Sequence, residues 1–138
     1  MSKTEPIIQK FMTYLPHSIE SKETVQAATK KLSELNIRHL PVTENGKLIG
    51  IVSDRDIRMA TSFVDSNPEL LKVKDICHDH PYQVEPTALL HDVVLEMAEK
   101  RYGSALVVQN GHLVGIFTTV DVCKALAHVL DLRFHTHA

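Results

Sequence analysis

The chain of 138 residues contains no tryptophan, only two cysteines and only 5% aromatic residues. Cys77 and Cys123 are far apart in the sequence and match no zinc-site or redox-motif spacing. Such sparse cysteine use favours a reduced, cytoplasmic setting over a fold held by disulfides. The sequence shows no secretory signal and no apolar run long enough to cross a bilayer, so we expect no membrane partner.

The chain also lacks a strong excess of charge of either sign. Fifteen lysines and arginines stand against 17 aspartates and glutamates, for a formal net charge of −2. Proteins that bind nucleic acids neutralise phosphates with clustered lysines and arginines, so a nucleic-acid partner has no electrostatic support here. The apolar fraction of 43% and the charged fraction of 23% are ordinary for a globular protein.

What the chain does contain is an internal repeat. The segments Gly50–Asp56 (Gly-Ile-Val-Ser-Asp-Arg-Asp) and Gly115–Asp121 (Gly-Ile-Phe-Thr-Thr-Val-Asp) are offset by 115 − 50 = 65 residues. The same offset aligns much of the preceding sequence without a gap, including Asn45-Gly46 with Asn110-Gly111. A fixed period of this kind predicts a repeated structural unit.

Each copy has the pattern of β-α-β-β-α, which predicts a mixed α/β (α+β) fold. Apolar residues at helical spacing follow Ser21 and Thr87, the expected N-caps, and Asn-Gly marks a type I′ hairpin turn in each copy. We predict an N-terminal segment (1–14) packing on the first repeat, a first repeat (15–62), a linker (63–72), a second repeat (73–130) with its last helix ending near residue 130, and a polar tail (131–138). One copy cannot bury both faces of its small sheet, so we expect the two to pack sheet to sheet with pseudo-two-fold symmetry.

Over nearly all of its length the sequence resembles a CBS-domain pair, also called a Bateman module. The resemblance rests on residues 36–42 (Asn-Ile-Arg-His-Leu-Pro-Val) and 45–57 of the first copy, and on 103–108 and 110–121 of the second. It implies a regulatory module that binds adenosine-containing ligands, such as AMP, ADP, ATP or S-adenosylmethionine, in clefts between the paired domains. It also implies a homodimer, no required cofactor and control of a separate, unknown protein.

Two interpretations fit Ser53-x-x-Asp56 and Thr118-x-x-Asp121. In the structural one, a hydroxyl residue at the N-cap and an acid at the third helical position form a capping box and suit the helix dipole. In the functional one, the helix N-terminus and the hydroxyl bind a phosphate, while the aspartate accepts the hydrogens of a ribose diol. The two roles are compatible.

By the same resemblance, an apolar slot for the adenine has walls from the first strand and the following strand of each copy. These residues are Ile19, Leu40 and Pro41 in the first copy and Val84, Ala105 and Leu106 in the second. All six also suit an ordinary hydrophobic core.

The copies differ in the cations near their motifs. The first copy has Arg38, His39, Arg55 and Arg58, where the second has Gly103, Ser104, Val120 and Cys123. Arginine makes bidentate, charge-assisted bonds to phosphate that glycine or valine cannot replace. This asymmetry predicts that the first copy binds a phosphorylated nucleotide, and the second a less anionic adenosyl ligand or none.

Other functions find little support. The run Cys77-His78-Asp79-His80 could chelate a metal, but no partner cluster has ligand spacing, so we expect no metal site. No catalytic triad motif and no phosphate-binding glycine loop occurs, and we do not expect an enzyme. The alternative to nucleotide sensing is a ligand-free module for protein interaction or dimerisation.

Overall fold

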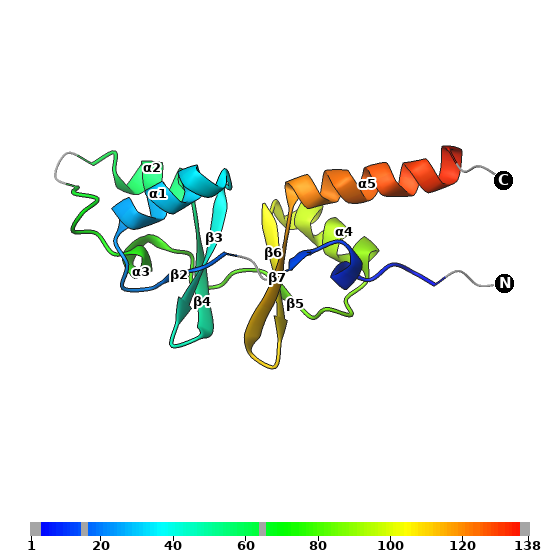
Figure 1. Cartoon of the computed structure of the whole chain (residues 1–138), viewed down its shortest axis with the longest axis horizontal. Helices are drawn as coiled ribbons and strands as arrows, with labels where there is room; N and C mark the ends of the chain where they lie inside the picture. The colour runs from blue at the N-terminus through cyan, green and yellow to red at the C-terminus, as the bar shows by residue number, and fades with distance from the viewer. Residues whose placement is uncertain (1–3, 15–16, 64–65, 136–138) are drawn as a thin grey trace. The chain divides into compact units, whose positions relative to one another are not determined.

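The computed structural model describes residues 4–14, 17–63 and 66–135. In these residues two β-sheets and five α-helices form two units, and the mixed α/β fold class is confirmed (Figure 1). We call Pro16–Pro81 the first-repeat unit, and Met1–Leu15 with Tyr82–Ala138 the second-repeat unit. None of the helices in the described ranges is both long and apolar enough to span a membrane.

The first-repeat unit is built on a sheet of order β2 (Ile19–Glu20), β3 (His39–Glu44) and β4 (Lys47–Ser53). Strand β3 runs parallel to β2 and antiparallel to β4. The helices of this unit are α1 (Val25–Leu35), α2 (Asp54–Ala60) and α3 (Val73–Ile76). The parallel pair needs a crossover, and α1 supplies it between β2 and β3.

The second-repeat unit has the sheet order β1-β7-β6-β5, with β6 antiparallel to β7 and parallel to β5. Its elements are η1 (Ile8–Lys10), β1 (Thr13–Tyr14), β5 (Gln83–Val84), α4 (Leu90–Lys100), β6 (Ser104–Gln109), β7 (His112–Thr118) and α5 (Thr119–Phe134). Helix α5 runs to Phe134 instead of ending near residue 130 as expected. Residues 136–138 of the predicted tail lie outside the described residues.

Both Asn-Gly turns have the predicted geometry. Asn45 and Gly46 have φ angles of 53° and 80°, and Asn110 and Gly111 have 54° and 79°. Positive φ at both central positions is what a type I′ turn requires. These turns set the register of the two antiparallel hairpins.

Each unit has its own core, formed where one face of an amphipathic helix covers one face of the sheet. In the first-repeat unit Val25, Ala28 and Leu32 of α1 pack with Leu40 and Val52. In the second-repeat unit the matching core contains Leu90, Val93, Met97, Ala105 and Phe117. The helical spacing in the sequence therefore identified the buried faces correctly.

The prediction that the N-terminal segment packs on the first repeat is wrong. Ile8 is fully buried in the core of the second-repeat unit, and its N–H donates to the Ala88 carbonyl at 2.8 Å. Val73 lies 65 residues further on and is fully buried in the first-repeat unit. Its N–H donates to the backbone carbonyl of Glu23 at 2.9 Å. Ile8, which precedes the first repeat, thus belongs to the core of the second-repeat unit, and Val73, the first residue of the predicted second repeat, belongs to the core of the first-repeat unit.

The structure also differs from the sequence prediction at the linker and at the helix N-caps. The N–H of Val25 at the start of α1 donates to the Leu71 carbonyl at 2.9 Å, so this part of the linker is anchored. The cap of α1 is Thr24, which accepts from the Ala27 N–H at 3.1 Å, and not Ser21. Ser21 is buried, and its hydroxyl bonds to Glu44 instead. Helix α4 begins after Leu89 without a side-chain cap, so Thr87 was also a wrong prediction.

Gly50 and Gly115 occupy equivalent positions in the two repeats, and each lies against one of these packed segments. A Cβ at Gly50 would lie 2.4 Å from the backbone oxygen of His78, whereas one at Gly115 would lie 2.4 Å from Sδ of Met12. A methionine side chain can move aside, but a carbonyl in a strand-like pairing cannot do so without backbone displacement. We expect Gly50→Ala to lower the free energy of unfolding by about 1–3 kcal/mol, and Gly115→Ala to lower it less. Urea denaturation measures both, and an equal or larger loss for Gly115→Ala would contradict this account.

Candidate functional site

The site begins where β4 passes into α2. Ser53 is the N-cap, with extended backbone angles, and its hydroxyl accepts the N–H of Asp56 at 3.1 Å. The carboxylate of Asp56 turns back and accepts the Ser53 N–H through Oδ2 at 2.8 Å. The capping interpretation is therefore confirmed in the first repeat. The interactions fix both the hydroxyl and the carboxylate at the end of the strand.

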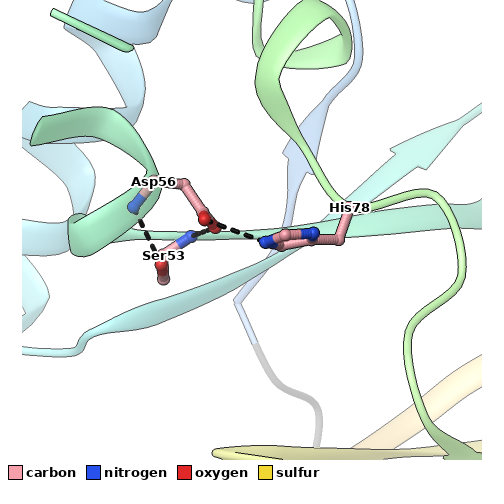
Figure 2. A network of polar contacts seen from close by, with 3 residues as sticks. All are labelled: Ser53, Asp56 and His78. Atoms are coloured by element: carbon pink, nitrogen blue, oxygen red, sulfur yellow. Dashed lines mark hydrogen bonds and ion pairs between the residues drawn. The ribbon is translucent and has the colours of Figure 1, made fainter. Parts of the chain in front are cut away.

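A third residue, His78, completes this arrangement (Figure 2). Its Nε2 lies 2.9 Å from Oδ1 of Asp56. The backbone of His78 is paired with Ile51, since each N–H donates to the carbonyl of the other, at 2.9 and 3.0 Å. The Asp56 side chain is only 16% exposed while the His78 side chain is 69% exposed. Both oxygens of the acid thus have a partner, one from the backbone and one from an exposed ring.

His39 lies beside the same acid. It is the residue of β3 that pairs with Ser53 in the register of the hairpin. Burial lowers the pKa of His39, and the negative charges of Asp54 and Asp56 offset part of this effect. The arrangement therefore keeps a neutral imidazole next to the carboxylate near neutral pH.

The second repeat has the same frame with different chemistry. Asp121 accepts the Thr118 N–H at 2.9 Å, and the Thr118 hydroxyl also points to the carboxylate, at 3.3 Å. The other oxygen of Asp121 is 3.4 Å from the hydroxyl of Thr13. Because 78 − 13 = 65, Thr13 occupies the position that His78 has in the first repeat. The buried Asp121 is therefore paired with a neutral hydroxyl in place of an imidazole.

The residues expected to line an adenine slot are well packed. Ile19 and Leu40 belong to the core of the first-repeat unit, and Ala105 to that of the second-repeat unit, against which the partly buried Val84 packs. Pro41 and Leu106 are also fully buried. The core interpretation accounts for this burial, and a role in a ligand slot stays a prediction.

The predicted cations do not all gather at one place. Arg38, Arg55 and Arg58 are exposed. Arg38 and Arg58 line a hollow of about 360 Å³ beside α1 and α2, together with Asp54, whereas Arg55 is not part of its lining. Ser53, Asp56 and His39 are therefore brought together by the hairpin, and two of the arginines border a different surface.

Sequence reasoning missed His78 and Thr13 as neighbours of the two acids. From the sequence, the run Cys77-His78-Asp79-His80 was considered only as a possible metal chelator. In the structure His80 contacts Asp79 at 2.8 Å on the exposed surface, while His78 turns to Asp56. Across residues 4–14, 17–63 and 66–135 no group of three or more His, Cys, Asp or Glu side chains could hold a metal ion. The fixed offset between positions 13 and 78 was the available signal.

Comparison with known proteins agrees with the repeat. A family model described as CBS domain matches residues 8–62 and 73–128. A CBS domain-containing protein from Dictyostelium discoideum is 30% identical over 136 residues, which cover 91% of this chain and 94% of that protein.

Solved structures are similar over most of the chain. A Vibrio cholerae structure, provisionally named an acetoin utilization protein, is 29% identical with a TM-score of 0.88, covering 98% of this chain and 100% of that one. The CBS domain pair of protein MJ0100, in complex with 5′-methylthioadenosine and S-adenosyl-L-methionine, is 23% identical with a TM-score of 0.81. That match covers 91% of this chain and 99% of the other.

The lowered pKa of His39 predicts a pH-dependent stability. Below the pKa of an unfolded histidine, about 6.5, the unfolded chain binds a proton that the folded chain resists, so stability falls as the pH falls. We expect His39→Gln to lose less stability than the unsubstituted protein between about pH 7.5 and pH 5.5. Thermal melts at both pH values measure this, with His112→Gln on the exposed hairpin as the control. Parallel losses in all three proteins would refute the assignment.

Proposed function

The chain belongs to the CBS domain family, and we propose that it is a regulatory module that binds an adenosine-containing ligand such as AMP, ADP, ATP or S-adenosylmethionine. The main support is the acid at the start of α2, held by the Ser53 N–H at 2.8 Å. The complex of the MJ0100 domain pair with two adenosine derivatives adds to it. In this proposal the protein acts by binding and not by catalysis.

The chemistry of the site suits a ribose. A carboxylate has lone pairs for about four hydrogen bonds, and a vicinal diol can donate two of them. Because Asp56 is mostly buried, a ligand that lacks one hydroxyl would leave part of the carboxylate unpaired. The hydroxyl of Ser53 lies beside it and can bond the next polar group of the ligand.

We further propose that the two repeats prefer ligands of different charge. The first repeat carries the exposed Arg55 in the first turn of α2, while the imidazole of His39 beside its acid is neutral near neutral pH and can offer only an uncharged hydrogen bond. The matching residues of the second repeat are Ser104 and Val120, which provide no cation. Phosphate recognition depends on charge-assisted bonds, so this difference favours a phosphorylated nucleotide in the first repeat and a less anionic adenosyl compound in the second.

Regulation requires more than binding. A ligand shifts a protein between two states only when it binds one state more tightly than the other. The regulated partner is proposed to be a separate protein that distinguishes these states.

The ribose contact is tested by isothermal titration with AMP. Replacing Asp56 by Asn keeps the shape of the side chain but removes its charge and half of its acceptor capacity. We expect the affinity to fall about 10- to 100-fold, the range for loss of a hydrogen bond to a charged group. Asp54→Asn, in the same turn, is the matched control and should stay within about threefold. No binding of AMP, ADP, ATP or S-adenosylmethionine to the unsubstituted protein would overturn the proposal.

A second candidate function is dimerisation, and helix α5 supports it. From Leu126 onward every described side chain of α5 is exposed. Apolar residues follow the alternating three- and four-residue spacing of a coiled-coil seam: Val120, Cys123, Ala127, Leu130 and Phe134. Figure 1 shows α5, in orange to red, as the longest helix of its unit. An apolar helix face of this kind is normally covered by another surface.

The charges next to this seam fit a second copy of the chain. Each heptad of the seam has two apolar residues, and a charged residue directly follows the second one. Lys124 follows Cys123, and Asp131 follows Leu130. In an antiparallel pair of helices these positions face each other, so Lys124 of one copy meets Asp131 of the other on both sides. We propose that α5 pairs with α5 of a second copy in this antiparallel manner.

Charge exchange tests the pairing. Lys124→Asp or Asp131→Lys alone places like charges opposite each other, and each should weaken the dimer, whereas the double substitution should restore it. Leu130→Glu should give a monomer because it buries a charge in the seam. Sedimentation velocity measures the species. A monomeric unsubstituted protein at about 100 μM, or single substitutions without effect, would contradict this interface.

A further inference from the structure

The aspartate proposed to bind the ligand has a different side-chain partner in each repeat. The partner decides how readily one carboxylate oxygen is available to the ligand. In the first repeat Nε2 of His78 is 2.9 Å from Oδ1 of Asp56. In the second repeat the hydroxyl of Thr13 is at 3.4 Å from Oδ1 of Asp121. The first contact is shorter, and its donor can carry a positive charge. The second contact is longer and always neutral.

The position of His78 is set by its backbone and not by its ring. Two hydrogen bonds join it to Ile51, and its carbonyl packs so closely on β4 that a side chain at Gly50 would collide with it. The ring itself is 69% exposed, so it can rotate into solvent without loss of core packing. Figure 2 shows the ring extending from its loop to the carboxylate of Asp56. The backbone of His78 is therefore fixed, while its side chain can move.

We propose that His78 is a gate on the first-repeat site: its ring occupies the oxygen of Asp56 that the ribose diol needs, and the ligand must displace it. This inference rests on the proposed function, because it assumes that the diol binds Asp56. A protonated imidazole forms a charge-assisted bond to a carboxylate, which is roughly twice as strong as a neutral one. The gate is therefore more firmly closed at low pH, and the first-repeat site binds adenosine compounds more weakly there.

Other charged and titratable groups act on His39 or lie next to His78 in the chain. Asp54 comes from α2, His39 from β3, Arg38 precedes β3, and Cys77 and Asp79 flank His78. Asp75 of α3 acts on Cys77 as well. His80, at 2.8 Å from Asp79, also lies near His78. Histidine is the side chain whose charge ordinarily changes between about pH 5 and pH 8. A test must therefore separate His78 from His39 and His80.

The experiment uses adenosine, which has the ribose diol but no phosphate that titrates near neutral pH. Isothermal titration is carried out at about pH 6 and about pH 8, on the full chain with Asp121→Asn so that only the first repeat keeps its acid. We expect adenosine to bind about three- to tenfold more weakly at the lower pH. Adding His78→Thr, the residue found in the second repeat, should remove most of this difference and tighten binding at low pH. His39→Gln in the same background should leave the difference in place.

The reciprocal variant makes the test independent of any one substitution. Thr13→His, in a chain with Asp56→Asn, should give the second-repeat site the pH dependence that it otherwise lacks. Adenosine binding that keeps its pH dependence in His78→Thr, or that loses it in His39→Gln, overturns the gate and leaves the proposed function intact. Failure of adenosine to bind to the unsubstituted chain at either pH overturns the gate, and the proposed function falls with it only when AMP, ADP, ATP and S-adenosylmethionine also fail to bind. Thermal melts of each variant confirm that it is folded.

Discussion

One hydrogen bond organises each half of this protein: the N–H of the residue at the end of a strand donates to a carboxylate three residues later. Its length is 2.8 Å at Ser53 and 2.9 Å at Thr118. The bond satisfies a backbone donor that the start of a helix would otherwise leave without an intrahelical partner. It also fixes an acid in a mostly buried position, with the side chain of Asp56 16% exposed. The proposed recognition of a ribose would use the same geometry as the cap.

The exchange of chain segments adds the chemistry that this geometry lacks. Residues before the first repeat complete the second-repeat unit, and residues 73–81, which open the predicted second repeat, complete the first-repeat unit. Each exchanged segment carries one side chain to the acid of its unit, Thr13 to Asp121 and His78 to Asp56. The two repeats therefore share the same frame and differ at these two positions outside the strand–helix motif.

Two exposed features lie close in the chain to the capped acids. Arg38 and Arg58 of the first-repeat unit border a hollow beside its helices, and the apolar seam of α5 belongs to the second-repeat unit. Both begin close to a capped acid in the chain, because Arg58 is two residues after Asp56 and α5 starts at Thr119, two residues before Asp121. Asp121 lies in the first turn of the same helix whose side chains are exposed from Leu126 onward. In the proposed function, a ligand at Asp121 would act on this first turn, and rigid secondary elements can carry such coupling.

The sequence by itself determined the repeat, the mixed α/β class, both Asn-Gly turns, the buried faces of the helices and the acids of the two motifs. All of these depend on local physics: periodic burial, positive φ at Asn-Gly, and a cap formed within three residues. It did not determine that Ile8 and Val73 pack on the opposite repeat, or that Ser21 would bond to Glu44 in place of capping a helix. Those contacts join residues far apart in the chain, where many partners have similar apolar or polar character. Only the tertiary structure decided which partner each one met, and so only it could bring His78 to Asp56.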